Sequence, residues 1–255
     1  MAFIELKGLT KQFGGLTAVN EVDFEIEKGK ITAIIGPNGA GKSTFFNLIS
    51  GFYPPSAGSI LFEGKDITRL PAHLCARLGI ARTFQTTHLF ERATVLDNVI
   101  VGHRLRTRST LFDAIFRTKR ERREAQAAYD KAMETLSFVG LEEIAERPVA
   151  GISQEAKKRV AIALALATDP KVIFLDEPAA GINPEETDDL ATLIKKIADS
   201  GITVCTIEHK MQMIMGLADS IMVLNHGAKI AEGSPAEIQN NPVVIEAYLG
   251  GGASA

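Results

Sequence analysis

The sequence predicts an α/β fold with a mainly parallel core sheet. The main observation is a set of uninterrupted apolar runs, which are typical of strands that are buried on both faces. Three such runs lie at residues 172–175, 202–207 and 221–224. A predicted helix separates the first two runs. It is expected to begin at Pro184, because proline is well suited to a first helical turn. Strands that alternate with helices in this way indicate a parallel sheet.

The first sixty residues are predicted to be rich in strands. Short runs of β-forming residues are separated by glycines and other turn residues, and their polarity alternates with a period of two. These runs lie at residues 3–7, 22–26, 31–35 and 59–62. After residue 35 the chain turns through a glycine-rich loop into a predicted helix at residues 42–50.

The pattern becomes helical from about residue 94 to residue 141, where helix-forming residues dominate. Within this stretch, residues 104–123 hold eight Lys or Arg and two acidic residues. A charge run of this kind is typical of a solvated helix face, and attraction to anionic lipid headgroups is the alternative. The last five residues, GGASA, are expected to form a tail.

Composition excludes several classes of protein. The chain has 255 residues, of which 45% are hydrophobic and 23% charged, and its net charge of −3 provides no basic field for nucleic acid. Its two cysteines, Cys75 and Cys205, form no CxxC pair and predict neither a disulfide framework nor a zinc site. The amino terminus lacks the apolar region of a signal peptide. The longest apolar run, residues 160–167, is far shorter than the roughly 20 residues of a membrane-spanning helix.

The glycine-rich loop reads GPNGAGKS and matches the pattern GxxxxGK followed by Ser or Thr. Its glycines would let the backbone wrap a polyphosphate, with N–H groups and a helix N-terminus pointing at the anionic oxygens. We expect Lys42 to reach the β- and γ-phosphates and the Ser43 hydroxyl to bind Mg²⁺; a plain glycine-rich turn is the alternative. The candidate nucleotide-binding residues here are Gly36, Pro37, Asn38, Gly39, Ala40, Gly41, Lys42, Ser43 and Thr44.

A pair of carboxylates, Asp176 and Glu177, ends the apolar run that begins at Val172. Asp176 is suited to hold Mg²⁺, and Glu177 is suited to orient and deprotonate an attacking water. Phosphoryl transfer depends on positioning and charge neutralisation, so both groups need a rigid support such as a strand end. A solvated turn is the alternative interpretation. The sequence therefore predicts an enzyme that hydrolyses a nucleoside triphosphate.

Beyond these motifs, the chain resembles the nucleotide-binding subunits of ABC transporters along nearly its whole length. Gln85, in ARTFQ, lies where that family has a glutamine that senses Mg²⁺ and couples to the membrane domains. His209, in TIEHKM, lies where the family has a histidine that contacts the γ-phosphate. Phe13, in KQFGG, matches an aromatic residue that stacks on adenine, and a core phenylalanine is the alternative. Asn183 stands where most members of the family have Asp, and Lys210 where an acidic residue is common.

The stretch ISQEA, residues 152–156, aligns with the family signature LSGGQ. In family dimers this loop covers the ATP that is bound to the other subunit, so the resemblance implies that Ser153 contacts the partner's ATP. Both glycines are replaced, the second by Glu155, which would repel phosphate or compete with it if it pointed toward the nucleotide. We therefore expect the site that uses this signature to turn over slowly, an asymmetry that a heterodimer would tolerate.

The resemblance also implies the architecture and the cofactors. It predicts one P-loop ATPase domain over residues 1–250 with a mainly parallel core sheet, an antiparallel β subdomain and a helical subdomain. The core and β subdomain would comprise about residues 1–85 and 160–250, and the helical subdomain residues 86–159. ATP and Mg²⁺ are the expected cofactors. The candidate catalytic residues are Lys42, Gln85, Glu177 and His209, and the candidate metal-binding residues are Ser43, Gln85 and Asp176.

Several stretches resemble one branch of the family, the LivG-type ATPases of branched-chain amino-acid importers: FGGLTAVN, DEPAAGINPEET, MGLADSIMVL and GSPAEIQNNPVVIEAYLG. The expected partners are membrane permease subunits, a second ATPase subunit, identical or different, and, indirectly, a solute-binding protein. The expected place is the cytoplasmic face of the membrane. The alternatives are the ATPase of another importer for amides, urea or other amino acids, a lipopolysaccharide exporter, a soluble ABC ATPase acting on DNA or ribosomes, and a regulatory subunit that only binds nucleotide.

Overall fold

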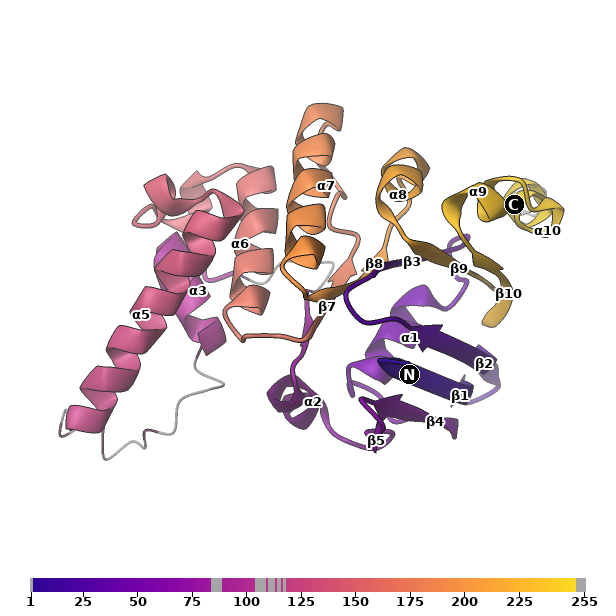
Figure 1. Ribbon diagram of the computed structural model, residues 1–255, viewed down its shortest axis with the longest axis horizontal. Helices are drawn as coiled ribbons and strands as arrows, with labels where there is room; N and C mark the ends of the chain where they lie inside the picture. The colour runs from indigo at the N-terminus through magenta and orange to yellow at the C-terminus, as the bar shows by residue number, and fades with distance from the viewer. Residues whose placement is uncertain are drawn as a thin grey trace.

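The computed structural model describes residues 2–83, 89–103, 109, 113, 116 and 118–250, and it is built around two β-sheets (Figure 1). The larger sheet has six strands in the order β10-β9-β3-β8-β7-β6. Five neighbouring strands run parallel, and only β10 is antiparallel to its neighbour. The strands are β3 (Ile31–Ile35), β6 (Ile80–Arg82), β7 (Val172–Asp176), β8 (Thr203–Ile207), β9 (Ser220–Asn225) and β10 (Ala228–Gly233). The predicted α/β fold with a mainly parallel sheet is confirmed.

Every residue of β3, β7 and β8 is buried, as their continuous apolar runs predict. Because these three strands are parallel, their carboxyl ends meet at one edge of the sheet. The glycine-rich loop follows β3, Asp176 ends β7 with Glu177 directly after it, and His209 follows β8. The sheet therefore brings the predicted motifs to a common edge.

The second sheet is antiparallel and contains the strand order β2-β1-β4-β5. Its strands are β1 (Ile4–Phe13), β2 (Leu16–Ile26), β4 (Ala57–Phe62) and β5 (Lys65–Asp66). Strand β1 is longer than the predicted run at residues 3–7, because the pairing with β2 shifts register after Leu6 and again after Leu9. Gly8 adopts a positive φ of 55° at this irregularity, and its N–H donates to the Asp23 carboxylate at 2.6 Å. A β-bulge at Gly8 thus lets the strand continue although the glycine interrupts the alternation of polar and apolar residues.

Helix α1 (Lys42–Ile49) lies between the two sheets and joins their cores. Its Phe45 and Phe46 are fully buried, and the Phe46 ring meets Phe174 of β7 edge to face at 4.9 Å between centroids. Helix α2 (Ala72–Leu78) follows the antiparallel sheet and leads into β6. Helices α8 (Met211–Leu217), α9 (Pro235–Gln239) and α10 (Pro242–Gly250) pack with β3 and β9 in a separate hydrophobic cluster.

A group of helices lies at the end of the molecule away from the antiparallel sheet (Figure 1). It contains α3 (Val95–His103), α5 (Lys119–Val139) and α6 (Gln154–Leu166), joined by the short 3-10 helices η2 (Glu142–Ile144) and η3 (Val149–Gly151). Helices α3 and α6 approach closely, since a Cβ on Gly102 would lie 2.2 Å from the Leu164 carbonyl oxygen. Helix α7 (Pro184–Asp199) shares a hydrophobic cluster with this group, which connects the helices to the large sheet.

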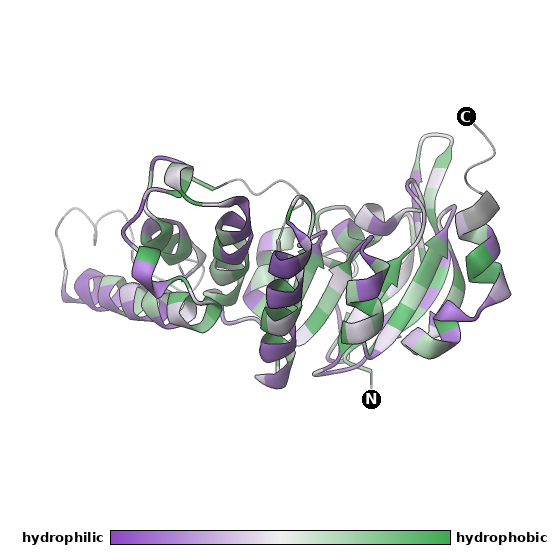
Figure 2. Cartoon of the chain, turned by 90° about the horizontal axis from the view of Figure 1, so that it is seen from above, coloured by the Kyte–Doolittle hydropathy of each residue, from purple (hydrophilic) through white to green (hydrophobic). Residues whose placement is uncertain are grey.

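Polar residues cover most of α5 and the outer side of α7 (Figure 2). Most of the basic stretch at residues 104–123 precedes α5 and lies outside the described residues, as does the tail at 251–255. No helix in the described part of the chain has the length and apolar character that a membrane span needs. Both cysteines are buried and unpaired.

Candidate functional site

The glycine-rich loop connects β3 to α1 and is compressed by neighbouring backbone. Gly36 has φ 149°, and a Cβ there would lie 2.0 Å from the Leu224 carbonyl oxygen. Gly41 has φ 98°, and a Cβ there would lie 2.2 Å from the Ala18 carbonyl oxygen. Only glycine fits these two positions, because any other residue would be strained at this positive φ and its Cβ would clash with backbone atoms. The loop is thereby held between the antiparallel sheet and β9.

Lys42 is the first residue of α1, and its ammonium group is turned back into the loop. Its Nζ donates to the carbonyl oxygens of Gly36 at 2.8 Å and Pro37 at 2.9 Å. Lys42 is only 6% exposed, which is rare for a lysine. Burial lowers the pKa of Lys42, and the negative charges of Glu177 and Asp176 partly offset this effect. The loop therefore holds a positive charge close to the two carboxylates.

A cavity of about 440 Å³ opens above this loop and collects most of the predicted site residues. Asn38, the residues that follow it up to Thr44, Glu177 and His209 all line it. The sequence did not reveal that Leu16, Thr17, Ala18, His226 and Gly227 complete its wall. Two tight turns bring these residues to the cavity, one in the β1–β2 hairpin and one between β9 and β10. The backbone N–H of Gly227 donates to the carbonyl oxygen of Ala40 at 3.0 Å.

Asp176 is the last residue of β7 and is 4% exposed. Its Oδ2 pairs with the Arg82 guanidinium at 2.9 Å, and its Oδ1 has no hydrogen-bond partner in the described part of the chain. A buried carboxylate oxygen without a partner is costly, so it marks a place where a ligand would be stabilised. Its backbone N–H donates to the Thr83 hydroxyl at 3.3 Å, which fixes the strand end.

Glu177 begins the turn after β7 with a positive φ of 48°, a conformation that costs free energy in a residue other than glycine. Its backbone N–H donates to the carbonyl oxygen of Ile207 at 2.9 Å, so β8 holds the turn in place. Its Oε1 lies 2.9 Å from Nε2 of His209. The strained turn therefore aims Glu177 at the histidine, inside the cavity that the glycine-rich loop lines.

The neighbours of His209 fix the loop that carries it. Glu208 is 3% exposed, and its carboxylate accepts hydrogen bonds from the backbone N–H groups of Ala179 at 2.6 Å and His209 at 3.1 Å. Lys210 donates from Nζ to the carbonyl oxygen of Ile182 at 3.0 Å and to the Thr187 hydroxyl at 2.7 Å. These bonds tie the histidine loop to the segment after Glu177. They explain why a lysine is useful at position 210, and the sequence alone revealed neither tie.

Ser153 lies outside the cavity, at the start of α6. It is exposed, and its hydroxyl oxygen accepts a hydrogen bond from the N–H of Ala156 at 3.1 Å, as a helix N-cap does. Glu155 forms an ion pair with Arg159 one turn later, and Arg159 also donates to the Val139 carbonyl oxygen at 3.1 Å. The Glu155 charge is thus neutralised along its own helix, so the repulsion expected from a free carboxylate at the helix start is reduced.

Phe13 is 42% exposed at the end of β1, so the alternative that it is a core residue is wrong. Its ring meets Tyr53 edge to face at 5.5 Å, and the Lys11 ammonium lies 5.0 Å from the ring centroid. Phe13 does not line the 440 Å³ cavity. Gln85 lies outside the described residues.

A larger cavity of about 540 Å³ lies between α8, α9 and α10. It is lined mainly by Met, Ile, Val and Tyr side chains, with no carboxylate, lysine or histidine. Hydrolytic chemistry needs such groups, so the smaller cavity is the candidate active site although it is not the largest.

A glycine-rich loop between a parallel strand and a helix, a carboxylate pair at the end of a second strand and a histidine just after a third strand define a P-loop nucleoside triphosphatase. Comparison with known families then makes the class specific. The profile of the ABC transporter family matches residues 19–180, and the profile of the branched-chain amino acid ATP-binding cassette transporter matches residues 228–254. The chain belongs to the ABC transporter family, as one of its ATP-hydrolysing, nucleotide-binding subunits.

Relatives and solved structures agree with this assignment. The chain is 43% identical to the high-affinity branched-chain amino acid transport ATP-binding protein BraF of Pseudomonas aeruginosa, over 97% of each chain. It is 42% identical to the corresponding protein LivG of Escherichia coli, again over 97% of each. A nucleotide-free ATP-binding cassette of an ABC transporter superposes with a TM-score of 0.86 at 35% identity, covering 97% of this chain and 99% of that one. An ADP-bound cassette gives a TM-score of 0.85 at 33% identity, with 98% and 99% covered.

Proposed function

We propose that this chain is an ATP-hydrolysing subunit of a membrane importer for branched-chain amino acids. The observation that carries the proposal is the meeting of the glycine-rich loop, Glu177 and His209 in one cavity. The branch is supported by the carboxyl-terminal profile match and by the names of the relatives. Its partners would be permease subunits, with a solute-binding protein acting on the other side of the membrane, so the chain would work at the cytoplasmic face.

In this proposal the loop binds ATP through Lys42 and its backbone N–H groups, which neutralise the β- and γ-phosphates. Ser43 and Asp176 fit Mg²⁺, because Ser43 is exposed and lines the cavity, and one buried oxygen of Asp176 has no hydrogen-bond partner among the described residues. No group of three or more His, Cys, Asp or Glu in the described residues could hold a metal alone, which suits a cation that takes its other ligands from phosphate and water. The bound metal would neutralise negative charge on the phosphates.

Glu177 is the proposed general base for the attacking water, and His209 holds it in place. The 2.9 Å contact between Glu177 Oε1 and His209 Nε2 orients the carboxylate, and the fixed turn after β7 limits its movement. On nucleotide binding His209 would contact the γ-phosphate. Gln85 is the proposed link from the metal to the permease, and Phe13 the proposed contact with adenine.

A second ATPase subunit would complete the site. We propose that Ser153, exposed at the start of α6, contacts the ATP bound by that partner, and that residues 86–159 form the helical subdomain that carries it. Because Glu155 and Ala156 replace signature residues, the reciprocal site is expected to be the slower one, and a different partner subunit would supply the better signature.

The experiment is reconstitution of the chain with its co-purified membrane subunits in proteoliposomes, followed by ATP hydrolysis and solute uptake. ATP-dependent uptake of leucine, isoleucine or valine supports the proposal. If an amide, urea or an unrelated amino acid stimulated ATP hydrolysis instead, the chain would belong to an importer of that solute. Co-purification with nucleic acid or ribosomes, and no permease, would contradict import altogether.

In the same assay Glu155→Gly should raise the ATPase rate of the complex, and an unchanged rate would contradict the proposed asymmetry.

A further inference from the structure

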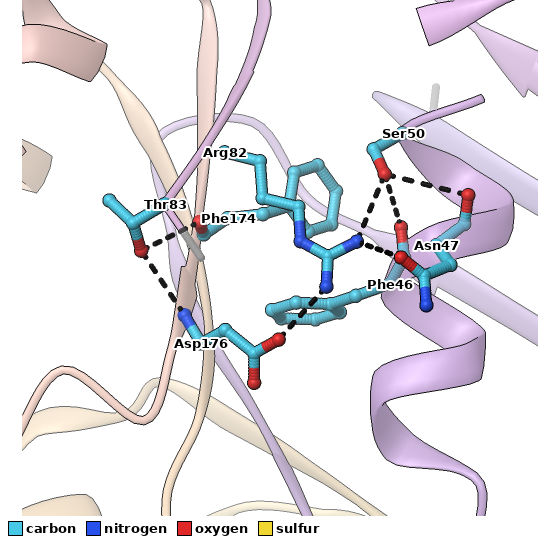
Figure 3. A network of polar contacts seen from close by, with 7 residues as sticks. All are labelled: Phe46, Asn47, Ser50, Arg82, Thr83, Phe174 and Asp176. Carbon is cyan, nitrogen blue, oxygen red and sulfur yellow. Dashed lines mark hydrogen bonds and ion pairs between the residues drawn. The ribbon is translucent and has the colours of Figure 1, made fainter. Parts of the chain in front are cut away.

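A buried arginine on β6 connects the candidate metal carboxylate to the helix that follows the glycine-rich loop (Figure 3). The Arg82 side chain is 8% exposed and that of Asp176 is 4% exposed. One guanidinium nitrogen, Nη2, donates to Asp176 Oδ2 at 2.9 Å. The other terminal nitrogen, Nη1, donates to Asn47 Oδ1 at 2.6 Å and to the Ser50 hydroxyl at 3.3 Å. The guanidinium carbon lies 5.8 Å from the centroid of the Phe46 ring.

This arrangement uses the planar fork of arginine, since the two terminal nitrogens hold groups on different elements. Asp176 belongs to β7, whereas Asn47 and Ser50 belong to α1 and its carboxyl-terminal end. Strand β6 runs beside β7, with Arg82 in register with Phe174. The carboxylate is therefore anchored to the same helix that begins at Lys42, through one side chain.

The consequence for Asp176 is an unequal use of its two oxygens. Oδ2 is occupied by the guanidinium, and Oδ1 has no hydrogen-bond partner in the described residues. Figure 3 shows Oδ1 turned away from the guanidinium. Through Arg82, Asp176 is tied to helix α1, which begins at Lys42 of the phosphate-binding loop. A carboxylate fixed through one oxygen presents the other in a constant direction, as in carboxylates that bind metals while their second oxygen is hydrogen-bonded.

We propose that Arg82 is a positioning residue, which fixes Asp176 through Oδ2 so that Oδ1 is presented to the Mg²⁺ that accompanies ATP. This inference rests on the proposed function, because it assigns Asp176 to the metal. Two other roles of Arg82 would affect metal binding differently. A purely structural ion pair with Asp176 would stabilise the fold without changing metal binding. A guanidinium that competes with the metal for Asp176 would weaken metal binding.

The test compares nucleotide binding with and without the metal in the full chain. The dissociation constant of ATP carrying a fluorescent N-methylanthraniloyl group is measured in Mg²⁺ and in EDTA. The constant in EDTA divided by the constant in Mg²⁺ gives the ratio by which the metal strengthens binding. Arg82→Met removes the fork and the charge, whereas Arg82→Lys keeps the charge but cannot hold both elements. We expect both variants to reduce the ratio about tenfold, as loss of a residue that orients a metal ligand does. Affinity in EDTA should change less than about twofold, since the loop itself is intact.

Asp176→Asn and the double variant with Arg82→Met complete a cycle. If Arg82 acts through Asp176, then Arg82→Met changes the ratio no further once Asp176 is Asn. Lys131→Met is the matched control, because it removes a partly buried ion pair with Asp169 at 2.8 Å on a distant helix. It should leave the ratio unchanged. Asn47→Ala removes one anchor of Arg82 without deleting the buried charge, and it should lower the ratio by a smaller factor.

The outcomes distinguish failure of the proposed role of Arg82 from failure of the proposed function. An unchanged or increased ratio in the Arg82 variants, together with a reduced ratio in Asp176→Asn, overturns the role of Arg82 and leaves the proposed function standing. A ratio that Asp176→Asn does not reduce overturns the metal assignment itself. If Arg82→Met does not fold, then Arg82→Lys and Asn47→Ala decide the question, and unchanged ratios in both overturn the inference.

Discussion

At the scale of single residues, the site is built from charged side chains in surroundings that normally exclude them. Lys42, Asp176 and Glu208 are each less than 10% exposed, at 6%, 4% and 3%. Each has hydrogen-bond or ion-pair partners that offset the cost of burial. Such groups are expected where binding, rather than stability, determines the residue.

Lys42 is buried for the sake of nucleotide binding, so its replacement should affect binding and stability differently. Lys42→Met should abolish tight ATP binding while leaving the nucleotide-free protein as stable or more stable, because the variant buries no ammonium group. Urea denaturation with and without ATP measures both effects. A large loss of stability without nucleotide would contradict this account.

The lowered pKa of Lys42 predicts how the stability difference between wild type and Lys42→Met depends on pH. Burial lowers the pKa of Lys42 below its ordinary value of 10.5, so the folded state releases its proton before the unfolded state does. Between those two values the unfolded chain binds more protons, and stability rises with pH. The nucleotide-free wild type should therefore gain stability relative to Lys42→Met as the pH rises toward 10.5, and a constant difference would contradict the shift.

Lys210 gives a prediction about the histidine loop. Lys210→Met removes the bonds to Ile182 and Thr187 and should lower the free energy of unfolding by about 1–3 kcal/mol, because a charge-assisted bond is lost and a carbonyl is left without its donor. Lys196→Met is the control, since Lys196 also donates to a carbonyl oxygen, that of Phe138, but is exposed. The control should cost less than about 0.5 kcal/mol. Equal losses in the two variants would show that Lys210 is an ordinary surface lysine.

At the scale of secondary-structure elements, residues that depart from the family pattern have local structural roles. Asn183 is the N-cap of α7: its side chain accepts a hydrogen bond from the N–H of Glu186, and the Glu186 side chain accepts one from the N–H of Asn183. Such a capping box satisfies two donors at the helix start. Asn183→Ala should therefore cost about 1 kcal/mol of stability, and Asn183→Asp almost nothing, because Asp caps equally well. Thermal denaturation of both variants tests this, and equal losses would exclude the cap as the reason for Asn.

Element boundaries show how far the sequence predicts the fold. The buried parallel strands were predicted within one residue at each end, because short apolar runs rich in β-branched residues and bounded by turn residues are typical of strands buried on both faces. Strand β1 was predicted too short at Gly8, where a bulge breaks the alternation. Strands β6 and β10 were not predicted, because β6 has three residues and β10 has no strongly apolar pattern.

At the scale of the whole molecule, the sheet assembles the site from segments far apart in the chain. The glycine-rich loop, Glu177 and His209 were predicted from local patterns, and the fold places them in one cavity, while Asp176 is buried at the end of the strand that precedes Glu177. The contacts that fix them were not predicted, for example Arg82 with Asp176, Lys210 with Ile182 and Arg159 with Val139. These contacts depend on distances that the fold sets, and no local pattern encodes them.

The buried cysteines provide a prediction about the cooperativity of the fold. Cys75 and Cys205 are 1% and 0% exposed, and burial raises the pKa of both thiols. Neither should react with a thiol reagent in the native state at pH 8, because thiolate and access are both lacking. Labelling during a urea titration should follow the loss of helix measured by circular dichroism. Rapid labelling of Cys205 before that loss would show that β8 opens separately from the rest of the core.

The most direct test of the central claim is a single-turnover measurement with radiolabelled ATP on the assembled complex, comparing wild type with Glu177→Gln. The claim is that the glycine-rich loop holds the triphosphate while Glu177 activates the attacking water. The account predicts that Glu177→Gln binds ATP as tightly as wild type, since the loop is unchanged, but releases labelled phosphate at least about a hundredfold more slowly. Wild-type phosphate release by Glu177→Gln, or a wild-type complex that retains no ATP in Mg²⁺, would contradict it.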